Sequence, residues 1–273
     1  MSNVLKLTEE EIQAIRETSK SIEFMSKLSF LHDHNGYRRG KLHTICGESG
    51  GGKSTIQKTL LVDLLLNNKE DLKIALWLSE EEGKDLIAEF SNQADLSKAL
   101  TKGVFSLFSE IENPKMEIKD LERQMRDMLK DCDIFFFDNI TTSKLYQDRA
   151  LSDQSKVAVG IKSMIKRYDK PMVIFSHTGG SLNRKALSQQ NDIRGNKSLV
   201  NISEIIYMVQ QFQHKSKKIT TLRCVKNRGN VTKSFGYFLR FDKEQMVYTE
   251  SKEQTAEIFN KVLKVSSQLN EVR

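Results

Sequence analysis

The stretch that decides the fold of this 273-residue chain is Gly47-Glu48-Ser49-Gly50-Gly51-Gly52-Lys53-Ser54-Thr55. It fits the pattern GxxxxGKS/T, in which the backbone N–H groups of a glycine-rich loop surround the phosphates of a nucleotide. Glycine is required because a Cβ atom would collide with the anion that the backbone encloses. The lysine neutralises β- and γ-phosphate oxygens, and the hydroxyl group after it binds Mg²⁺. We therefore expect Gly47–Thr55 to bind ATP, with Lys53 on the phosphates and Ser54 on the metal.

The loop lies between a predicted strand and a predicted helix, and this alternation continues to residue 176. Strands are expected at Leu42–Cys46, Lys73–Leu78, Val104–Phe108, Asp133–Phe137 and Met172–Ser176, and helices at Lys53–Asn67, Gly83–Asp95, Glu117–Leu129 and Asp153–Tyr168. Strands that alternate with helices are typical of an α/β fold, in which helices cover both faces of a mostly parallel sheet.

The two ends of the chain have a different pattern. Antiparallel strands are predicted at Ile205–Val209, Ile219–Val225 and Phe235–Phe241, followed by a C-terminal helix at Ser251–Val265. At the other end, Thr8 and Glu11 form a capping box for an amphipathic helix over residues 8–30. The predicted organisation is an N-terminal linker helix in residues 1–35 and one α/β domain in residues 36–273.

The composition narrows the class of partner. A formal net charge of +7 favours a polyanion, although a protein of the ribosome or of a membrane surface would have the same balance. No apolar run approaches the roughly 20 residues that cross a bilayer, so we expect no membrane partner. The three cysteines lack metal-site spacing, which predicts buried thiols in a cytoplasmic protein.

Carboxylates follow two of the predicted strands. Asp138 comes directly after an apolar strand, where a carboxylate would hold the metal through water, whereas Asp133 opens that strand as a solvated or capping residue. Hydrolysis also needs a base for the attacking water, and Asn139 rather than a glutamate follows Asp138. The run Glu80-Glu81-Glu82 ends another strand, so it lies either at the ligand-binding edge or in a solvated first helical turn.

In the order of these motifs the chain resembles RecA-type ATPases, most closely the motor domain of DnaB-like replicative helicases and the RepA-like plasmid helicases. The resemblance covers residues 20–250 and implies a RecA-like P-loop NTPase core in residues 36–273, which would be the motor domain. Ser79-Glu80-Glu81 matches the Ser-x-Glu of that family, which places the catalytic base at Glu81 and leaves Glu80 as the alternative. The resemblance also assigns the metal-binding carboxylate to Asp138.

Two later elements carry further roles that the resemblance implies. His177 follows a strand, where the family places a residue that senses the γ-phosphate, although a lone histidine there is as often a surface group. Lys226-Asn227-Arg228-Gly229 is similar to the K-x-R-x-G element, with its glycine one place early. In the family such a lysine and arginine reach the γ-phosphate of a neighbouring subunit, so Lys226 and Arg228 are predicted to be catalytic. The alternative is a basic hairpin turn.

Two loops would face the central channel of such a ring, Thr141–Ser155 and Gly179–Ser198. The second loop carries the predicted contacts to single-stranded DNA, which are Asn183, Arg184, Lys185, Arg194 and Lys197. Tyr146 in the first loop is the one candidate for base stacking, so contacts to the phosphate backbone are expected instead. A solvated loop without a ligand remains the alternative.

The resemblance implies a homohexameric, ATP-driven DNA helicase of a phage or plasmid replication system, with a replication loader or primase as a further partner. Three alternatives stay open: a RecA-like recombinase or mediator that forms filaments, a KaiC-like regulatory ATPase with a protein partner, and a small-molecule kinase. Single-stranded DNA would stimulate ATP hydrolysis by a helicase or a recombinase, and it would leave the hydrolysis rate of a regulatory ATPase unchanged.

Overall fold

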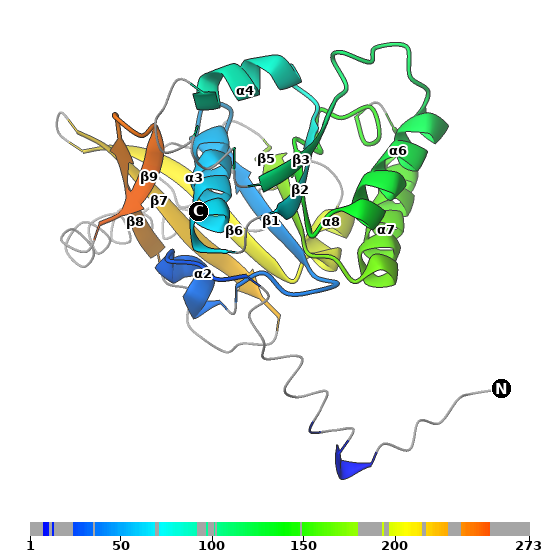
Figure 1. Cartoon of the computed structure of the whole chain (residues 1–273), viewed down its shortest axis with the longest axis horizontal. Coiled ribbons are helices and arrows are strands. Elements are labelled where there is room, and N and C mark those ends of the chain that lie inside the picture. Colours follow the sequence, from blue (N-terminus) through cyan, green and yellow to red (C-terminus); the bar gives the residue numbers. More distant parts are fainter. Residues whose placement is uncertain are drawn as a thin grey trace, which may run out of the picture.

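The computed structural model describes residues 8–10, 13, 24–34, 36–68, 71–91, 97, 101, 103–147, 149–179, 193, 197–214, 217–228 and 236–251. Within these residues nine strands form one sheet in the order β3-β2-β4-β5-β1-β6-β7-β8-β9 (Figure 1). The strands are β1 Leu42–Gly47, β2 Leu72–Leu78, β3 Gly103–Ser109, β4 Ile134–Asp138, β5 Met172–His177, β6 Ile205–His214, β7 Lys217–Asn227, β8 Gly236–Asp242 and β9 Val247–Glu250. The six strands from β3 to β6 are parallel, and β7, β8 and β9 add antiparallel pairs at one side.

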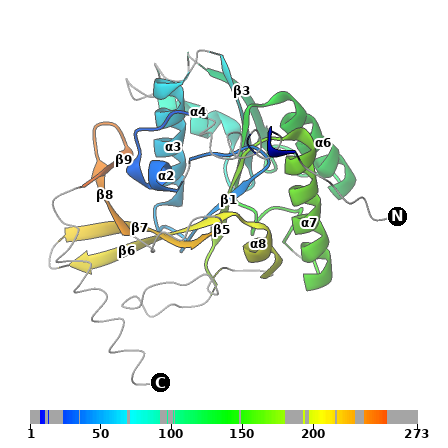
Figure 2. The same cartoon turned by 90° about the horizontal axis from the view of Figure 1, so that it is seen from below.

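Helices cover both faces of the sheet, as the alternating pattern predicts (Figures 1 and 2). The helices are α2 Ser29–Asp33, α3 Lys53–Asn67, α4 Gly83–Ser91, α6 Ile118–Asp131, α7 Leu151–Tyr168 and α8 Lys197–Ile202. One buried cluster joins α2, α3 and α4 to the sheet, and a second joins α6, α7 and α8 to its other face. In β4, Phe136 belongs to the first cluster while Phe135 and Phe137 belong to the second, which explains why this central strand is apolar throughout.

The prediction of one helix over residues 8–30 is wrong at its C-terminal end. Residues 24–28 are not helical, and α2 is a separate helix of five residues. The backbone N–H of Met25 donates to Asn68 Oδ1 at 2.8 Å, and that of Lys27 donates to Asp63 Oδ1 at 2.9 Å. Because side chains in α3 and at its C-terminal end accept from these N–H groups, the segment is fixed against α3 and these two N–H groups are not free for helical hydrogen bonds. The domain boundary at residue 35 stays a prediction.

The C-terminal strands differ from the prediction in one pairing and one addition. β6 is antiparallel to β7, as predicted, but it lies parallel to β1 on its other side, with Gly47 opposite Val209. The strand β9 was not expected, and its Tyr248 packs into the core beside α3. The predicted helix after residue 251 lies outside the described residues.

Two predicted loops also change their bounds. Thr141–Ser155 is a loop only as far as residue 150, because α7 begins at Leu151. Most of Gly179–Ser198 lies outside the described residues, and its last two residues belong to α8, which the sequence pattern did not predict. The three cysteines are buried and free, as expected. No helix in the described ranges is long and apolar enough to span a membrane.

A buried carboxylate ties β2 to the segment that follows β4. Glu110, directly after β3, is 4% exposed, and it accepts hydrogen bonds from Trp77 Nε1 at 2.6 Å, from Ser143 Oγ and from the backbone N–H of Lys144 at 2.8 Å. Three donors compensate the cost of burying this charge. Glu110 therefore fixes the segment that follows Asp138, at the edge of the sheet where β2 and β4 end.

We expect Glu110→Ala to lower the free energy of unfolding by about 2–4 kcal/mol, because it leaves three donors without their acceptor. Urea denaturation followed by the fluorescence of Trp77 measures this loss. Glu117→Ala is the matched control, since Glu117 is exposed before α6 and makes no capping bond, so its effect should stay within about 0.5 kcal/mol. Equal losses in the two variants would contradict the proposed role of Glu110.

Candidate functional site

The strand order brings the predicted site residues to one edge of the sheet. β2, β4, β5 and β1 are consecutive and parallel, so their carboxyl ends lie side by side. The register places Leu78 opposite Asp138 and Gly47 opposite His177. The loops after these four strands therefore meet above β5, although they are up to 130 residues apart in sequence.

The glycine loop after β1 has the backbone that its sequence predicts. Gly50 and Gly52 have φ of 68° and 96°, a left-handed conformation that favours glycine. A Cβ atom on Gly52 would lie 2.4 Å from Tyr248 Oη, and one on Gly51 would lie 2.9 Å from the carbonyl oxygen of Glu48. The helix α3 begins directly after the loop, so its first N–H groups and the positive end of its dipole point toward the same space. This arrangement is a cradle for an anion.

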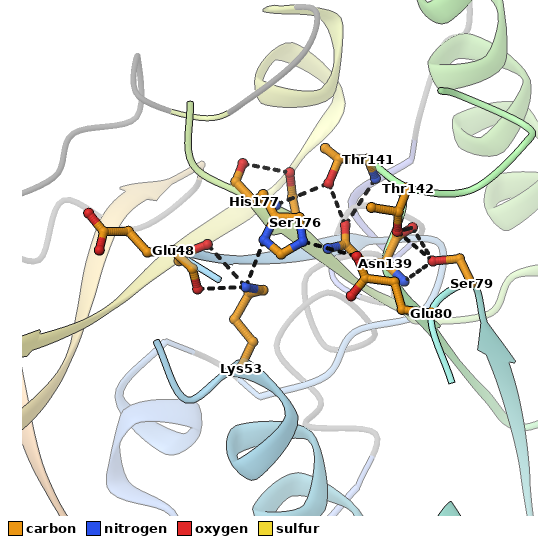
Figure 3. A network of polar contacts seen from close by, with 10 residues as sticks. Glu48, Lys53, Ser79, Glu80, Asn139, Thr141, Thr142, Ser176 and His177 are labelled. Carbon is orange, nitrogen blue, oxygen red and sulfur yellow. Dashed lines mark hydrogen bonds and ion pairs between the residues drawn. The ribbon is translucent and has the colours of Figure 1, made fainter. Parts of the chain in front are cut away.

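Lys53, the first residue of α3, is the cation of the cradle. Its side chain is buried, and Nζ donates to the carbonyl oxygens of Gly47 at 3.1 Å and Glu48 at 2.8 Å (Figure 3). Its third contact is His177 Nδ1 at 3.0 Å. Burial lowers the pKa of this lysine, and the nearby carboxyl group of Asp138 opposes the shift. Lys53 forms no salt bridge within the part of the chain that the structure describes.

His177 connects Lys53 to the strand-end glutamates. Because an ammonium group only donates, Nδ1 accepts its hydrogen bond, which places the ring proton on Nε2. Nε2 lies 3.1 Å from Glu80 Oε1 and donates to it (Figure 3). This bond, more than any other interaction, lowers the pKa of Glu80. The imidazole of His177 thus joins Lys53 to Glu80.

Glu81 has a different environment from its neighbour. Burial raises the pKa of its carboxyl group, while the charge of Lys58 on α3 opposes the shift. Its backbone carbonyl accepts a hydrogen bond from Ser109 Oγ at 2.8 Å. Glu81 is therefore half-buried between α3 and the end of β3, and Glu80 is the one that contacts His177.

Asp138 ends β4 in the position predicted for a metal-binding carboxylate. Its pKa is raised to about 7, mainly by burial, with the charges of Glu80 and Glu81 adding to the shift and that of Lys53 opposing it. A carboxyl group with this environment gains from a cation beside it, and oxygen ligands are the ones that Mg²⁺ prefers. Ser54 is exposed in the first turn of α3, where its hydroxyl is available. Asp138 and Ser54 therefore fit a magnesium ion that a nucleotide brings to the cradle.

Three hydroxyl side chains around the site, those of Ser79, Thr141 and Thr142, were given no role by the sequence reasoning. Ser79 Oγ exchanges hydrogen bonds of 2.8 Å with the backbone of Asn139 and contacts Thr142 Oγ1 at 2.8 Å. Thr141 Oγ1 accepts from the backbone N–H of His177 at 3.3 Å (Figure 3). These bonds connect the ends of β2, β4 and β5. The polar run after Asp138 was the available signal for these residues. A polar run that follows a buried parallel strand lies at the same edge of the sheet as the glycine loop.

Lys226 and Arg228 lie at the opposite edge of the sheet. Asn227, between them, pairs with Ile205 in β6, and Ile205 lies opposite His43 near the start of β1. The path from His43 to Gly47 is about 13 Å along β1, at about 3.3 Å per residue. The structure therefore does not bring Lys226 and Arg228 to the cradle of their own chain.

The predicted DNA contacts are only partly placed. Lys197 is exposed at the start of α8, while Asn183, Arg184, Lys185 and Arg194 lie outside the described residues. Tyr146 is 1% exposed and belongs to the core, so the suggestion that it stacks on bases is wrong. Its ring fills space between the segment after β4 and the neighbouring helices.

The buried carboxyl group of Asp138 makes the stability of the nucleotide-free protein depend on pH. Its folded pKa of about 7 lies above the usual value near 4, so between these values the folded state holds a proton that the unfolded chain has lost. Its contribution to stability therefore falls as the pH rises from about 4 to about 7. We expect Asp138→Asn to raise the free energy of unfolding by about 1–2 kcal/mol at pH 8 and little at pH 5.

Urea denaturation at both pH values, without nucleotide or metal, measures this difference. Partial solvent contact of Asp138 keeps the expected gain below the full value of the shift. Asp127→Asn on the exposed side of α6 is the control and should show no difference between the two pH values. A gain for Asp138→Asn that is as large at pH 5 as at pH 8 would show that burial of charge is not the cause.

The relationship of this chain to known proteins is visible in its fold. No protein-family model matches the chain, and no curated protein matches its sequence. Among solved structures it is similar to the ATPase domain of G40P, with a TM-score of 0.70 and 15% identity, over 89% of this chain and 98% of that one. At this identity the likeness shows the fold alone. The predicted RecA-like fold, a mostly parallel sheet with helices on both faces and antiparallel strands toward the C-terminus, is thereby confirmed.

Proposed function

We propose that this chain is an ATP hydrolase of the hexameric, DnaB-like kind, a helicase or translocase that moves along single-stranded DNA. The observation that carries ATP binding is the ammonium group of Lys53, which is buried behind the glycine loop and has no salt bridge among the described residues. A buried cation without a salt bridge is costly unless an anion compensates it. The glycine loop and the start of α3 supply backbone donors at the same place, which suits a phosphate chain.

The residues around the cradle would divide the work of phosphoryl transfer. Lys53 would leave the carbonyl groups of Gly47 and Glu48 and bind the β- and γ-phosphate oxygens. Ser54 and Asp138 would hold Mg²⁺, which supplies charge that neutralises the same oxygens. His177 would sense the γ-phosphate, since a nucleotide that draws Lys53 away leaves Nδ1 without its present partner.

We assign the base that orients and deprotonates the attacking water to Glu81. Burial raises the pKa of its carboxyl group toward the working range of a general base. Glu80 is the alternative, because its carboxylate already contacts the imidazole of His177. In this proposal Glu80 instead holds His177 in place until a nucleotide arrives.

Hydrolysis would occur between subunits. Lys226 and Arg228 lie too far from their own cradle and are proposed to reach the γ-phosphate on a neighbouring subunit of a homohexamer. The loop after β5 would contact single-stranded DNA through Asn183, Arg184, Lys185, Arg194 and Lys197. A replication loader or primase would be a further partner in the cytoplasm.

The first experiment is steady-state ATP hydrolysis with and without single-stranded DNA. We expect wild-type protein to hydrolyse ATP and DNA to stimulate it several-fold, because contacts in the channel would favour the assembled state. Lys53→Ala removes the cation of the cradle and should show no turnover. Hydrolysis that is indifferent to DNA would overturn the helicase proposal and favour a regulatory ATPase with a protein partner. Filaments rather than rings on DNA would favour a recombinase or mediator.

The two glutamates after β2 can be separated by matched substitutions. Glu81→Gln should still bind ATP, measured with a fluorescent analogue, but lower kcat at least about a hundredfold, since the water loses its base. Glu80→Gln keeps an acceptor for His177 Nε2 and should lower kcat less than about tenfold. The reverse order of effects would move the base to Glu80.

A further inference from the structure

The strand β5 extends beyond its pairing with β4. The last paired residues of the two strands are Phe137 and Ile174. On the other side of β5, the backbone N–H of Thr178 donates to the carbonyl oxygen of Gly47 in β1 at 3.2 Å. Because the backbone groups of successive strand residues point to opposite sides, the N–H of His177 points to the side where β4 has ended. This N–H group needs an acceptor from another part of the chain.

The hydroxyl group of Thr141 is that acceptor. Its Oγ1 lies 3.3 Å from the backbone nitrogen of His177 (Figure 3). Thr141 is buried in the segment that follows β4, so water does not compete strongly for this bond. A backbone N–H can only donate, which means that Thr141 Oγ1 accepts here and gives its own proton to a different group.

Asn139 receives the proton of that hydroxyl group. Its Oδ1 accepts from Thr141 Oγ1 at 2.6 Å and from the backbone N–H of Thr141 at 3.0 Å. These two donors fix the orientation of the amide, and they direct the lone pairs of Thr141 Oγ1 toward His177. Asn139 is fully buried, and its Nδ2 has no hydrogen-bond partner in the part of the chain that the structure describes. Such an amide is costly, which indicates a role other than stability.

The backbone of Asn139 adds a connection to β2. Its N–H donates to Ser79 Oγ at 2.8 Å, and its carbonyl oxygen accepts from the same hydroxyl group at 2.8 Å. Ser79 directly precedes Glu80, and Asn139 directly follows Asp138. The residue after the predicted metal-binding carboxylate therefore holds the end of β2 through its backbone and the end of β5 through its side chain.

We propose that Asn139 and Thr141 are positioning residues, which hold His177 in place for its action on the γ-phosphate. This inference rests on the proposed function, because it takes His177 to sense that phosphate. Thr141 fixes the backbone of His177, while the ring contacts Lys53 at 3.0 Å and Glu80 at 3.1 Å. Both ring contacts depend on the same backbone position, so a displacement there would disturb them together.

The substitution Thr141→Val tests this role, because valine has the shape of threonine without its hydroxyl group. We expect kcat for ATP hydrolysis to fall about fivefold to twentyfold, while the affinity for a fluorescent ATP analogue changes less than about twofold because the glycine loop is intact. Thr141→Ser keeps the hydroxyl group and should retain most of the turnover.

Thr44→Val in β1 is the matched control. Thr44 is also buried, and its Oγ1 lies 2.7 Å from Ser203 Oγ, so the substitution likewise removes a buried hydroxyl group and its hydrogen bond. It should lower kcat less than about twofold. Equal turnover in Thr141→Val and Thr44→Val would contradict the positioning role.

A double-mutant cycle shows whether Thr141 acts through His177. His177→Ala removes the ring and should itself lower kcat. In that background Thr141→Val should lower kcat less than about twofold further, because no ring is left to position. Asn139→Ala should follow the same pattern, since it takes away the acceptor that orients the hydroxyl group of Thr141. A loss for Thr141→Val that is equally large with and without the ring would overturn the inference.

A measurement without nucleotide separates this inference from the proposed function. Nitrogen-15 NMR of histidine-labelled protein reports which ring nitrogen of His177 carries the proton, with His177→Asn to assign its signals. We expect the Nε2–H form in wild-type protein and in Thr44→Val, and a mixture of both forms in Thr141→Val. If the wild-type protein hydrolyses no ATP, the proposed function fails, and this spectrum still decides whether Thr141 positions the ring. If Thr141→Val keeps the Nε2–H form alone, the inference is overturned and the proposed function is unaffected.

Discussion

The ammonium group of Lys53 is the constraint on which the rest of the site depends. It is buried at the start of α3 and is held by two carbonyl oxygens and one imidazole, which accept hydrogen bonds without neutralising its charge. Its position requires a loop that turns sharply enough to begin a helix beside a strand end, which the left-handed Gly50 and Gly52 provide. The neighbouring strand β5 must then end in a residue that can accept a hydrogen bond, and His177 does so.

The charges around Lys53 are poorly compensated in the free protein. Burial raises the pKa of Asp138 and of Glu81 and lowers that of Lys53, so each of these groups is less stable in its charged form than it would be in water. Residues selected only for stability would not be arranged in this way. A nucleotide with its metal supplies the missing charges of both signs, and binding would therefore stabilise the folded state through the same groups that act on the phosphates.

Local sequence was sufficient for the features that local chemistry determines. The glycine loop, the alternating strands and helices, and the positions of Asp138 and His177 at strand ends could be predicted because each depends on residues close in sequence. Features that depend on distant residues could not. The segment after Phe24 leaves the predicted helix because Asp63 and Asn68 accept hydrogen bonds from its backbone. The parallel pairing of β6 with β1 joins two segments that are far apart in sequence, so neither segment alone indicates it. The contact of His177 with Glu80 likewise needs the strand order.

The two edges of the sheet make the chain asymmetric in a way that bears on assembly. One edge presents donors and a cation for a phosphate chain, and the other presents an excess of positive charge around Glu204. In the proposed assembly these two surfaces would meet head to tail, an association that closes into a ring or continues as a filament. Each nucleotide would then lie between two subunits, and its terminal phosphate would contribute to the attraction between them. Because hydrolysis would weaken that attraction, binding at the interface and the state of the nucleotide would be coupled, and a ligand that stabilises the assembly would also change nucleotide affinity.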